Sequence, residues 1–198
     1  REARLVKSPY EVACLRRATE IAEDALLDAL RLARPGITEM ELARVFETGV
    51  AQRGGRPVFT VVTFGERAAL ADTPPSARAL APGDVMRFDI GVRYQGYCSD
   101  IARTAVLGRP SPKLAAYYQA MLEGEEAMLA AIRPGITAQE IFRIAVDQVR
   151  AAGVPHYQRQ HVGHAIGLEV YDALSLAPGV ERPIEAGMTL AVETPYYE

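Results

Sequence analysis

Apolar residues recur at helical spacing in two consecutive segments near the start of the chain. The first begins with Ser8 as a helix N-cap, and Pro35-Gly36 ends it. The second begins with Thr38 as N-cap, and Glu41 at the third helical position completes a capping-box pattern. A β-prone stretch, residues 57 to 64, follows. The first hundred residues therefore predict two helices that lead into strands.

The same plan returns in the second half of the chain. The letters RPGITEMEL at 34–42 recur as RPGITAQEI at 133–141, and Thr137 again caps a helix. β-like segments follow around residues 157–170 and 188–194. We expect an α+β fold of two similar α-α-β-β halves, with the strands of both halves joined over one cleft.

Two acidic residues interrupt the most β-prone part of the chain, FDIGVRYQGYCSD at 88–100. Asp89 and Asp100 stand in what the pattern predicts to be two strands joined at Tyr94-Gln95-Gly96. If the turn centres between the first two of these residues, the aspartates face each other with Cβ atoms roughly 5 Å apart. Carboxylates that close repel, so one must be protonated or both must share a cation. Because Asp is disfavoured inside strands, a site is favoured over a turn-forming role.

Composition bounds the class of protein. The chain has 198 residues, of which 49% are apolar and 24% charged, and its net charge is −3. These values suit one globular domain, residues 1–198, and argue against a nucleic-acid or membrane partner. The chain opens without Met and stops after a dense motif, so we expect a piece of a longer protein. Cys14 and Cys98 are expected to be buried thiols in a reducing cytoplasm.

Other candidate ligands lie in the last forty residues. Of the three histidines, His161 and His164 fall in HVGHAIG, where glycines permit close backbone approach. Glu193 follows the apolar run TLAV, where an acid either reaches solvent or needs a partner. Together with the aspartate pair, His164 and Glu193 make an oxygen-rich set with one imidazole. Such a set suits two ions of Mn, Co, Fe or Zn, which activate a water and stabilise an oxyanion.

Three motifs in order resemble one known family. The stretches FDIGVRYQGYCSDIARTAVLG, HVGHAIGLEVYD and IEAGMTLAVETPYY are similar to the catalytic domain of the proline-peptidase and methionine-aminopeptidase family, which includes aminopeptidase P, prolidase and creatinase. The resemblance implies the pita-bread fold, with two pseudo-symmetric halves and a curved, mainly antiparallel sheet.

The resemblance also implies a metal-ligand set. Two divalent ions are held by two Asp, one His and two Glu, and Asp89, Asp100, His164 and Glu193 match the first four. The fifth ligand has no counterpart, so we expect a chain truncated at its C-terminus and lacking an N-terminal domain.

Two positions depart from the family pattern. In LADTPPS, Asp72 stands where the family usually has His, and in EVYD, Tyr171 replaces a second His. His161 lies three residues before His164, whereas relatives such as aminopeptidase P place a substrate-facing His four before. Tyr171 can still donate a hydrogen bond, and Asp72 suits the holding of a substrate amine. The metal set is kept and the substrate contacts are changed.

We therefore expect a metallopeptidase that hydrolyses an amide bond near a peptide N-terminus, of Xaa-Pro type. Glu193 would shuttle the proton, while His161 and Tyr171 orient a peptide or small amide substrate. One alternative is a creatinase-like C–N hydrolase that needs no metal, against which the kept aspartates argue. Another is an inactive binding module, which the two lost histidines support. Proline-cleaving relatives are commonly dimers, so a cytoplasmic homodimer is expected.

Overall fold

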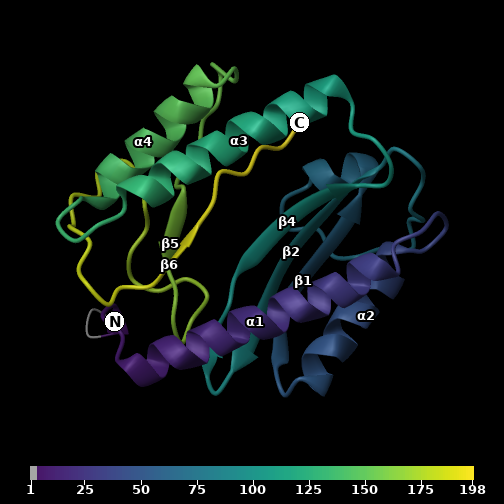
Figure 1. Ribbon diagram of the computed structural model, residues 1–198, viewed down its shortest axis with the longest axis horizontal. Helices are drawn as coiled ribbons and strands as arrows, with labels where there is room; N and C mark the ends of the chain where they lie inside the picture. Colours follow the sequence, from purple (N-terminus) through teal and green to yellow (C-terminus); the bar gives the residue numbers. More distant parts are fainter. Residues whose placement is uncertain (1–3) are drawn as a thin grey trace. The chain divides into compact units, whose positions relative to one another are not determined.

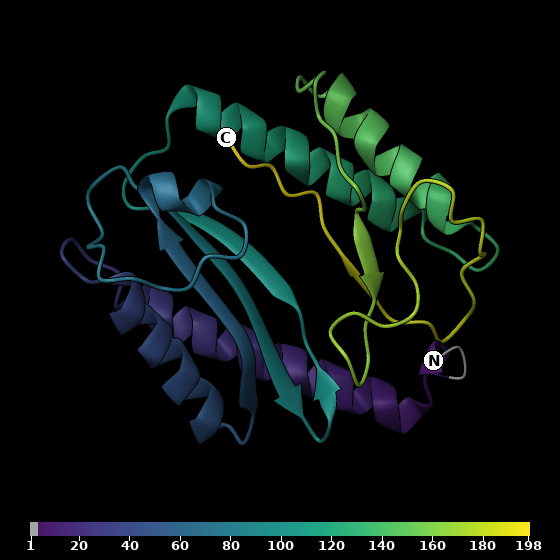
Figure 2. The same ribbon diagram turned by 180° about the vertical axis from the view of Figure 1, so that it is seen from behind.

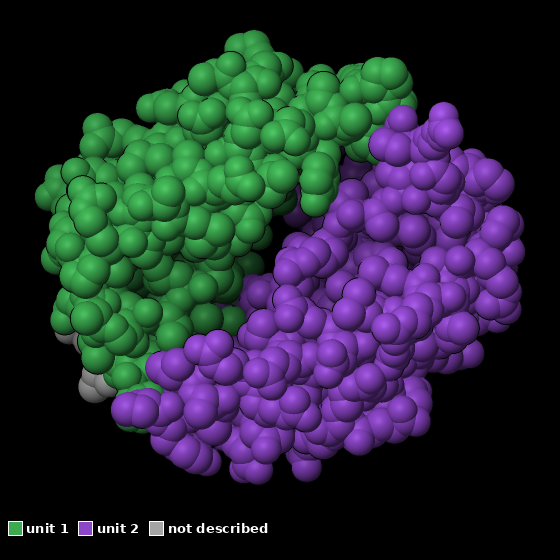
Figure 3. Space-filling model, viewed as in Figure 1, with its two compact units in different colours: residues 1–8, 111–167, 171–196 green, residues 9–110, 168–170, 197–198 purple. Residues whose placement is uncertain are grey.

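The computed structural model describes residues 4–198, which form two compact units. Of the described residues, unit 1 comprises 4–8, Ser111–Gly167 and Tyr171–Tyr196. Unit 2 comprises Pro9–Pro110, Leu168–Val170 and Tyr197–Glu198. Figure 3 shows the two units in different colours.

Unit 2 is built from two helices and an antiparallel sheet. Its elements are α1 (Pro9–Arg31), α2 (Glu39–Gln52), β1 (Arg56–Phe64), a 3₁₀ turn (Gly65–Ala69), β2 (Val85–Tyr94), β3 (Tyr97–Cys98) and β4 (Ile101–Val106). Strand β2 lies between β1 and β4, and α1 and α2 cover one face of these strands (Figures 1 and 2). Helix α1 ends at Arg31, before the predicted stop at Pro35-Gly36, because the residue before a proline disfavours helical backbone.

The helices of unit 2 bury the apolar stripes that the sequence predicted. Phe46 of α2, Phe64 of β1 and Phe88 of β2 are fully buried in one core. Thr38 and Glu41 form the predicted capping box at the start of α2. Alternate residues of β2 face this core, so Arg87 and Asp89 lie on the opposite face of the strand.

The register of the aspartate hairpin differs from the conditional prediction. Tyr94 pairs with Tyr97, so the turn centres on Gln95 and Gly96, whose φ angles are +49° and +92°. Both positive values are typical of a type I′ turn. Asp89 therefore lies opposite Ala102, and Asp100 is its diagonal neighbour rather than its direct partner. The expected 5 Å face-to-face arrangement is wrong.

Unit 1 repeats the helix pair and adds two short strands. Its elements are α3 (Pro112–Ala131), α4 (Ala138–Ala151), β5 (Gly163–Ala165) and β6 (Leu190–Val192), and the strands pair antiparallel. Thr137 and Glu140 form the second capping box, as the repeat predicted. Tyr157 and Ile141 are buried in the core of this unit.

Two further findings concern the cysteines and the helices. Cys14 and Cys98 are both buried free thiols, as predicted. Among residues 4–198, no helix has the length and apolarity that a membrane span requires.

Candidate metal centre

Unit 2 contributes the two aspartates as a diagonal pair on one face of an antiparallel ladder. Asp100 lies between β3 and β4, outside both strands, and Ser99 donates its backbone N–H to Val92 O over 2.7 Å. The pairs on either side, Ile90 with Ile101 and Arg93 with Cys98, have the same register, from which we infer that Asp100 lies across from Gly91. Residues two apart on a strand share a face, so Asp89 and Asp100 point to the same side. Figures 1 and 2 show β2 and β4 side by side.

The environment of Asp89 disfavours its negative charge. Burial raises the pKa of this carboxyl above its ordinary value, and the nearby carboxylates of Asp100 and Asp72 raise it further. The guanidinium of Arg87 opposes that rise and donates a hydrogen bond of 2.6 Å to Asp89 Oδ2. A carboxylate in this position gains from a neighbouring cation, which is the property expected of a metal ligand.

Arg87 is a partner of the candidate ligand Asp89 that the motifs did not reveal. It lies two positions before Asp89, and its side chain is 11% exposed. The signal in the sequence is the charged pair within the apolar strand, since positions i and i+2 share a face. Asp72, by contrast, lies on the exposed part of a loop that Arg87 contacts at the carbonyls of Leu70 and Ala71.

Unit 1 contributes His164 and Glu193 in a similar diagonal arrangement. His164 of β5 pairs with Ala191 of β6. Glu193 comes directly after β6 and donates its backbone N–H to Val162 O over 3.0 Å, so the ladder continues by one residue. His164 and Glu193 therefore lie on one face of this strand pair, as Asp89 and Asp100 do on theirs.

The surroundings of His164 fix which ring nitrogen is available to a ligand. The side chain is buried, and Nδ1 lies 3.2 Å from Ala165 O. A carbonyl oxygen only accepts, so Nδ1 carries the proton and donates. In this tautomer Nε2 carries the lone pair, which is the arrangement that metal-ligating histidines commonly adopt.

Three further side chains surround this pair within unit 1. His161 Nδ1 lies 3.4 Å from Glu193 Oε1, and a guanidinium nitrogen of Arg159 lies 3.7 Å from the same oxygen. Burial lowers the pKa of His161, and the charge of Arg159 lowers it further, so its imidazole is neutral at pH 7. The Tyr171 ring packs against His164, with ring centroids 3.9 Å apart.

The donor set fits a divalent metal in chemical type. Each unit offers one diagonal pair, Asp89 with Asp100 and His164 with Glu193, and among residues 4–198 no three His, Cys, Asp or Glu side chains are gathered as a metal site. Carboxylate oxygens with one imidazole are typical ligands of Mn, Fe, Co and Zn.

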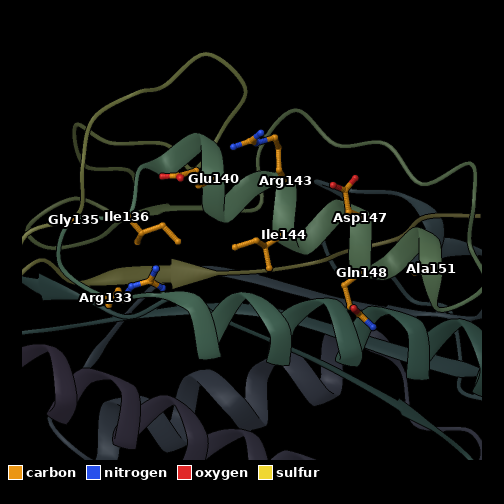
Figure 4. Close-up of a pocket in the computed structure, with 9 residues that line it drawn as sticks. All are labelled: Arg133, Gly135, Ile136, Glu140, Arg143, Ile144, Asp147, Gln148 and Ala151. Atoms are coloured by element: carbon orange, nitrogen blue, oxygen red, sulfur yellow. The ribbon is translucent and has the colours of Figure 1, made fainter.

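A separate pocket lies in unit 1, along α4. It has a volume of about 710 Å³ and is lined by residues of that helix and by Arg133, Gly135 and Ile136 (Figure 4). None of the candidate ligands lines this pocket, so it does not belong to the proposed centre.

Comparison with known proteins defines the class. The model of metallopeptidase family M24 matches residues 13–198, and the chain belongs to this family. Its α+β fold is accordingly the pita-bread fold of these peptidases.

Two curated proteins show the sequence similarity of individual family members. The chain is 33% identical over 196 residues to the uncharacterized peptidase YqhT of Bacillus subtilis, covering 98% of this chain and 56% of that protein. It is 33% identical over 199 residues to the Xaa-Pro dipeptidase of Pyrococcus horikoshii, covering 100% of this chain and 57% of that protein. The chain thus spans little more than half the length of these relatives.

Solved structures of two peptidases are also similar to this chain in their fold. The Xaa-Pro dipeptidase from Bacillus anthracis has a TM-score of 0.95 and 34% identity, covering 100% of this chain and 56% of that one. The prolidase from Pyrococcus horikoshii has a TM-score of 0.95 and 32% identity, covering 100% of this chain and 58% of that one.

Proposed function

We propose that the protein is a metal-dependent peptidase that hydrolyses the amide bond of Xaa-Pro peptides. The observation that carries this proposal is the pair of diagonal ligand sets, one on each antiparallel ladder, in a chain that belongs to family M24. The names of its Pyrococcus and Bacillus anthracis relatives, both Xaa-Pro dipeptidases, support the substrate class.

The proposed metal ligands are Asp89, Asp100, His164 and Glu193. Two divalent ions, with manganese as the first to test, would polarise the amide carbonyl and supply an activated water when bound. The buried Asp89 carboxyl and the Nδ1–H of His164 support this role, because one gains from a cation and the other presents Nε2.

The remaining roles belong to side chains around these ligands. Glu193 takes the proton of the attacking water and passes it to the leaving amine. His161, neutral at pH 7, can donate a hydrogen bond to the substrate without adding a charge. Tyr171 is 64% exposed and presents its hydroxyl to a substrate oxygen. Asp72 is exposed and pairs with the ammonium group of the substrate.

The whole protein is proposed to act in the cytoplasm as a homodimer. The two buried free thiols support a reducing compartment. Light scattering on the full-length protein measures the oligomer directly, and a monomeric mass contradicts the dimer.

Turnover with and without metal tests the proposed function. The full-length protein is stripped with a chelator, reloaded with Mn²⁺ and assayed on Ala-Pro, Ala-Ala and creatine. We expect cleavage of Ala-Pro only in the reloaded protein. Cleavage without metal supports the creatinase-like alternative, and metal binding without hydrolysis of any amide supports the binding module. Either result contradicts the peptidase.

A further inference from the structure

Arg87 is a buried arginine in β2, a strand whose other charged residues are Asp89 and Arg93. Its neighbours Met86 and Phe88 face the core of unit 2, while Arg87 shares the other face with Asp89. The residue is only 9% exposed. Burial of a guanidinium is costly unless its N–H groups are paired, so its partners show what the arginine does.

The Arg87 guanidinium joins three separate segments of unit 2. It donates hydrogen bonds to Leu70 O over 3.0 Å and to Ala71 O over 2.6 Å. It also donates to Asp89 Oδ2 over 2.6 Å and to the Tyr197 hydroxyl over 3.2 Å, and its Cζ lies 5.0 Å from the Tyr197 ring centroid. Only the planar fork of arginine can serve so many acceptors from one position.

The loop that Arg87 contacts is held on its other side as well. Arg67 donates to Pro74 O over 2.9 Å, and Ser76 donates its backbone N–H and its hydroxyl to the buried Glu39 carboxylate over 2.8 and 2.7 Å. The backbone is thus fixed before and after Asp72, whose side chain stays exposed. A carboxylate on a fixed backbone can recognise a cation without a large loss of conformational entropy.

We propose that Arg87 is the positioning residue that fixes the Asp72 loop beside Asp89, so that the Asp72 carboxylate selects substrates with a free N-terminal ammonium group. The inference rests on the proposed peptidase function and names its substrate class more narrowly. Arg87 acts through the loop backbone and through Asp89, and it makes no contact with the substrate.

Three variants of the full-length, Mn²⁺-loaded protein test this role. Arg87→Met removes all four donated hydrogen bonds at similar length, and Arg87→Lys keeps the charge but cannot reach every acceptor. Arg103→Met on β4 is the matched control, because Arg103 is exposed and donates its hydrogen bonds to Ala102 O and to the exposed Glu23 carboxylate. Thermal unfolding verifies that each variant is folded before it is compared.

The first readout is hydrogen exchange in a peptide that spans residues 70–76. We expect faster exchange in Arg87→Met, an intermediate rate in Arg87→Lys and the wild-type rate in Arg103→Met. Unchanged exchange in both Arg87 variants overturns the positioning role. This readout needs no turnover, so it decides the role of Arg87 even if the wild-type protein fails to cleave any Xaa-Pro peptide.

The second readout is the discrimination between Ala-Pro and N-acetyl-Ala-Pro. In Arg87→Met we expect KM for Ala-Pro to rise about tenfold, which corresponds to about 1.4 kcal/mol, while kcat changes much less. KM for the acetylated peptide should stay near its wild-type value, and Asp72→Asn should give the same pattern. A variant that loses kcat equally on both peptides, with KM unchanged, overturns the selection of the ammonium group.

Discussion

The phenol ring of Tyr171 lies against the buried imidazole of His164, with ring centroids 3.9 Å apart and planes inclined by 33°. Tyr171 is 64% exposed, whereas His164 is 2% exposed. The largely exposed tyrosine therefore packs its ring against the buried imidazole of the proposed ligand. At the position where the family resemblance leads us to expect a histidine, this chain has a side chain with both a packing contact and a hydroxyl group.

Two substitutions at Tyr171 separate these roles. Tyr171→Phe keeps the ring contact, so we expect Mn²⁺ affinity to stay unchanged while kcat/KM falls about tenfold, the loss typical of one hydrogen bond. Tyr171→Ala uncovers His164 and should weaken Mn²⁺ binding as well. Calorimetric titration with Mn²⁺ measures the difference. Equal affinity in the alanine variant contradicts the covering role.

The raised pKa of Asp89 predicts a pH-dependent effect on the metal-free protein. Burial raises the pKa of Asp89 in the folded state above the ordinary value of 3.8. At pH values between the ordinary pKa and the raised pKa, the folded state therefore binds more protons than the unfolded state. The stability of the metal-free protein therefore decreases as pH rises through this interval. Asp89→Asn removes the ionisable carboxyl and with it this decrease in stability, so the variant should have a higher unfolding temperature than wild type at pH 7.

The gain in Asp89→Asn should shrink as the pH falls toward 4, where the wild-type carboxyl becomes protonated. Thermal unfolding of the metal-free proteins at several pH values measures it. If the variant is less stable than wild type by the same margin at every pH, the hydrogen bond with Arg87 outweighs burial, and the direction of the shift is wrong.

Glu39 is a fully buried carboxylate whose loss should destabilise unit 2. It accepts hydrogen bonds from the backbone N–H groups of Phe64 and Ser76 and from Arg67. Glu39→Gln removes its charge and turns one acceptor into a donor, so we expect a loss of about 2–4 kcal/mol in the free energy of unfolding. Glu20→Gln, which breaks only an exposed pair with Arg17, is the control. Urea unfolding compares them, and equal effects contradict the prediction.

Gly163 is required where β5 meets β6. Its φ is +143°, and a Cβ there would lie 2.3 Å from Ala191 O. Gly153 also has a positive φ, +116°, but a Cβ would have open space. Gly163→Ala should therefore cost about 1–3 kcal/mol of stability beyond the effect of Gly153→Ala, because only the first adds a steric clash. Urea unfolding measures this difference, and similar losses in the two variants contradict the close approach.

Local signals sufficed for the helices and for the class of the fold. The capping boxes at Thr38 and Thr137 were visible in the sequence because a cap needs only residues within one turn. The hairpin register was not fixed by the same kind of signal. Gln95 adopts a positive φ that is uncommon outside glycine, and it moved the turn centre by one residue.

The partners of the candidate site were harder to predict than its ligands. Asp89 and Asp100 stand out because acids are rare inside strands. Arg87 contacts Leu70, Ala71 and Tyr197, which lie 16 to 110 positions away in the sequence, and no local pattern records such contacts.

The central proposal is that Asp89, Asp100, His164 and Glu193 are ligands of the divalent ions on which the proposed activity depends. Metal content of the full-length protein reloaded with Mn²⁺, measured for wild type, Asp100→Asn and Glu193→Gln, tests it most directly. We predict two equivalents in wild type and a loss of at least one in each variant. If either variant retains both ions, its residue is not a ligand and the proposed ligand set is contradicted.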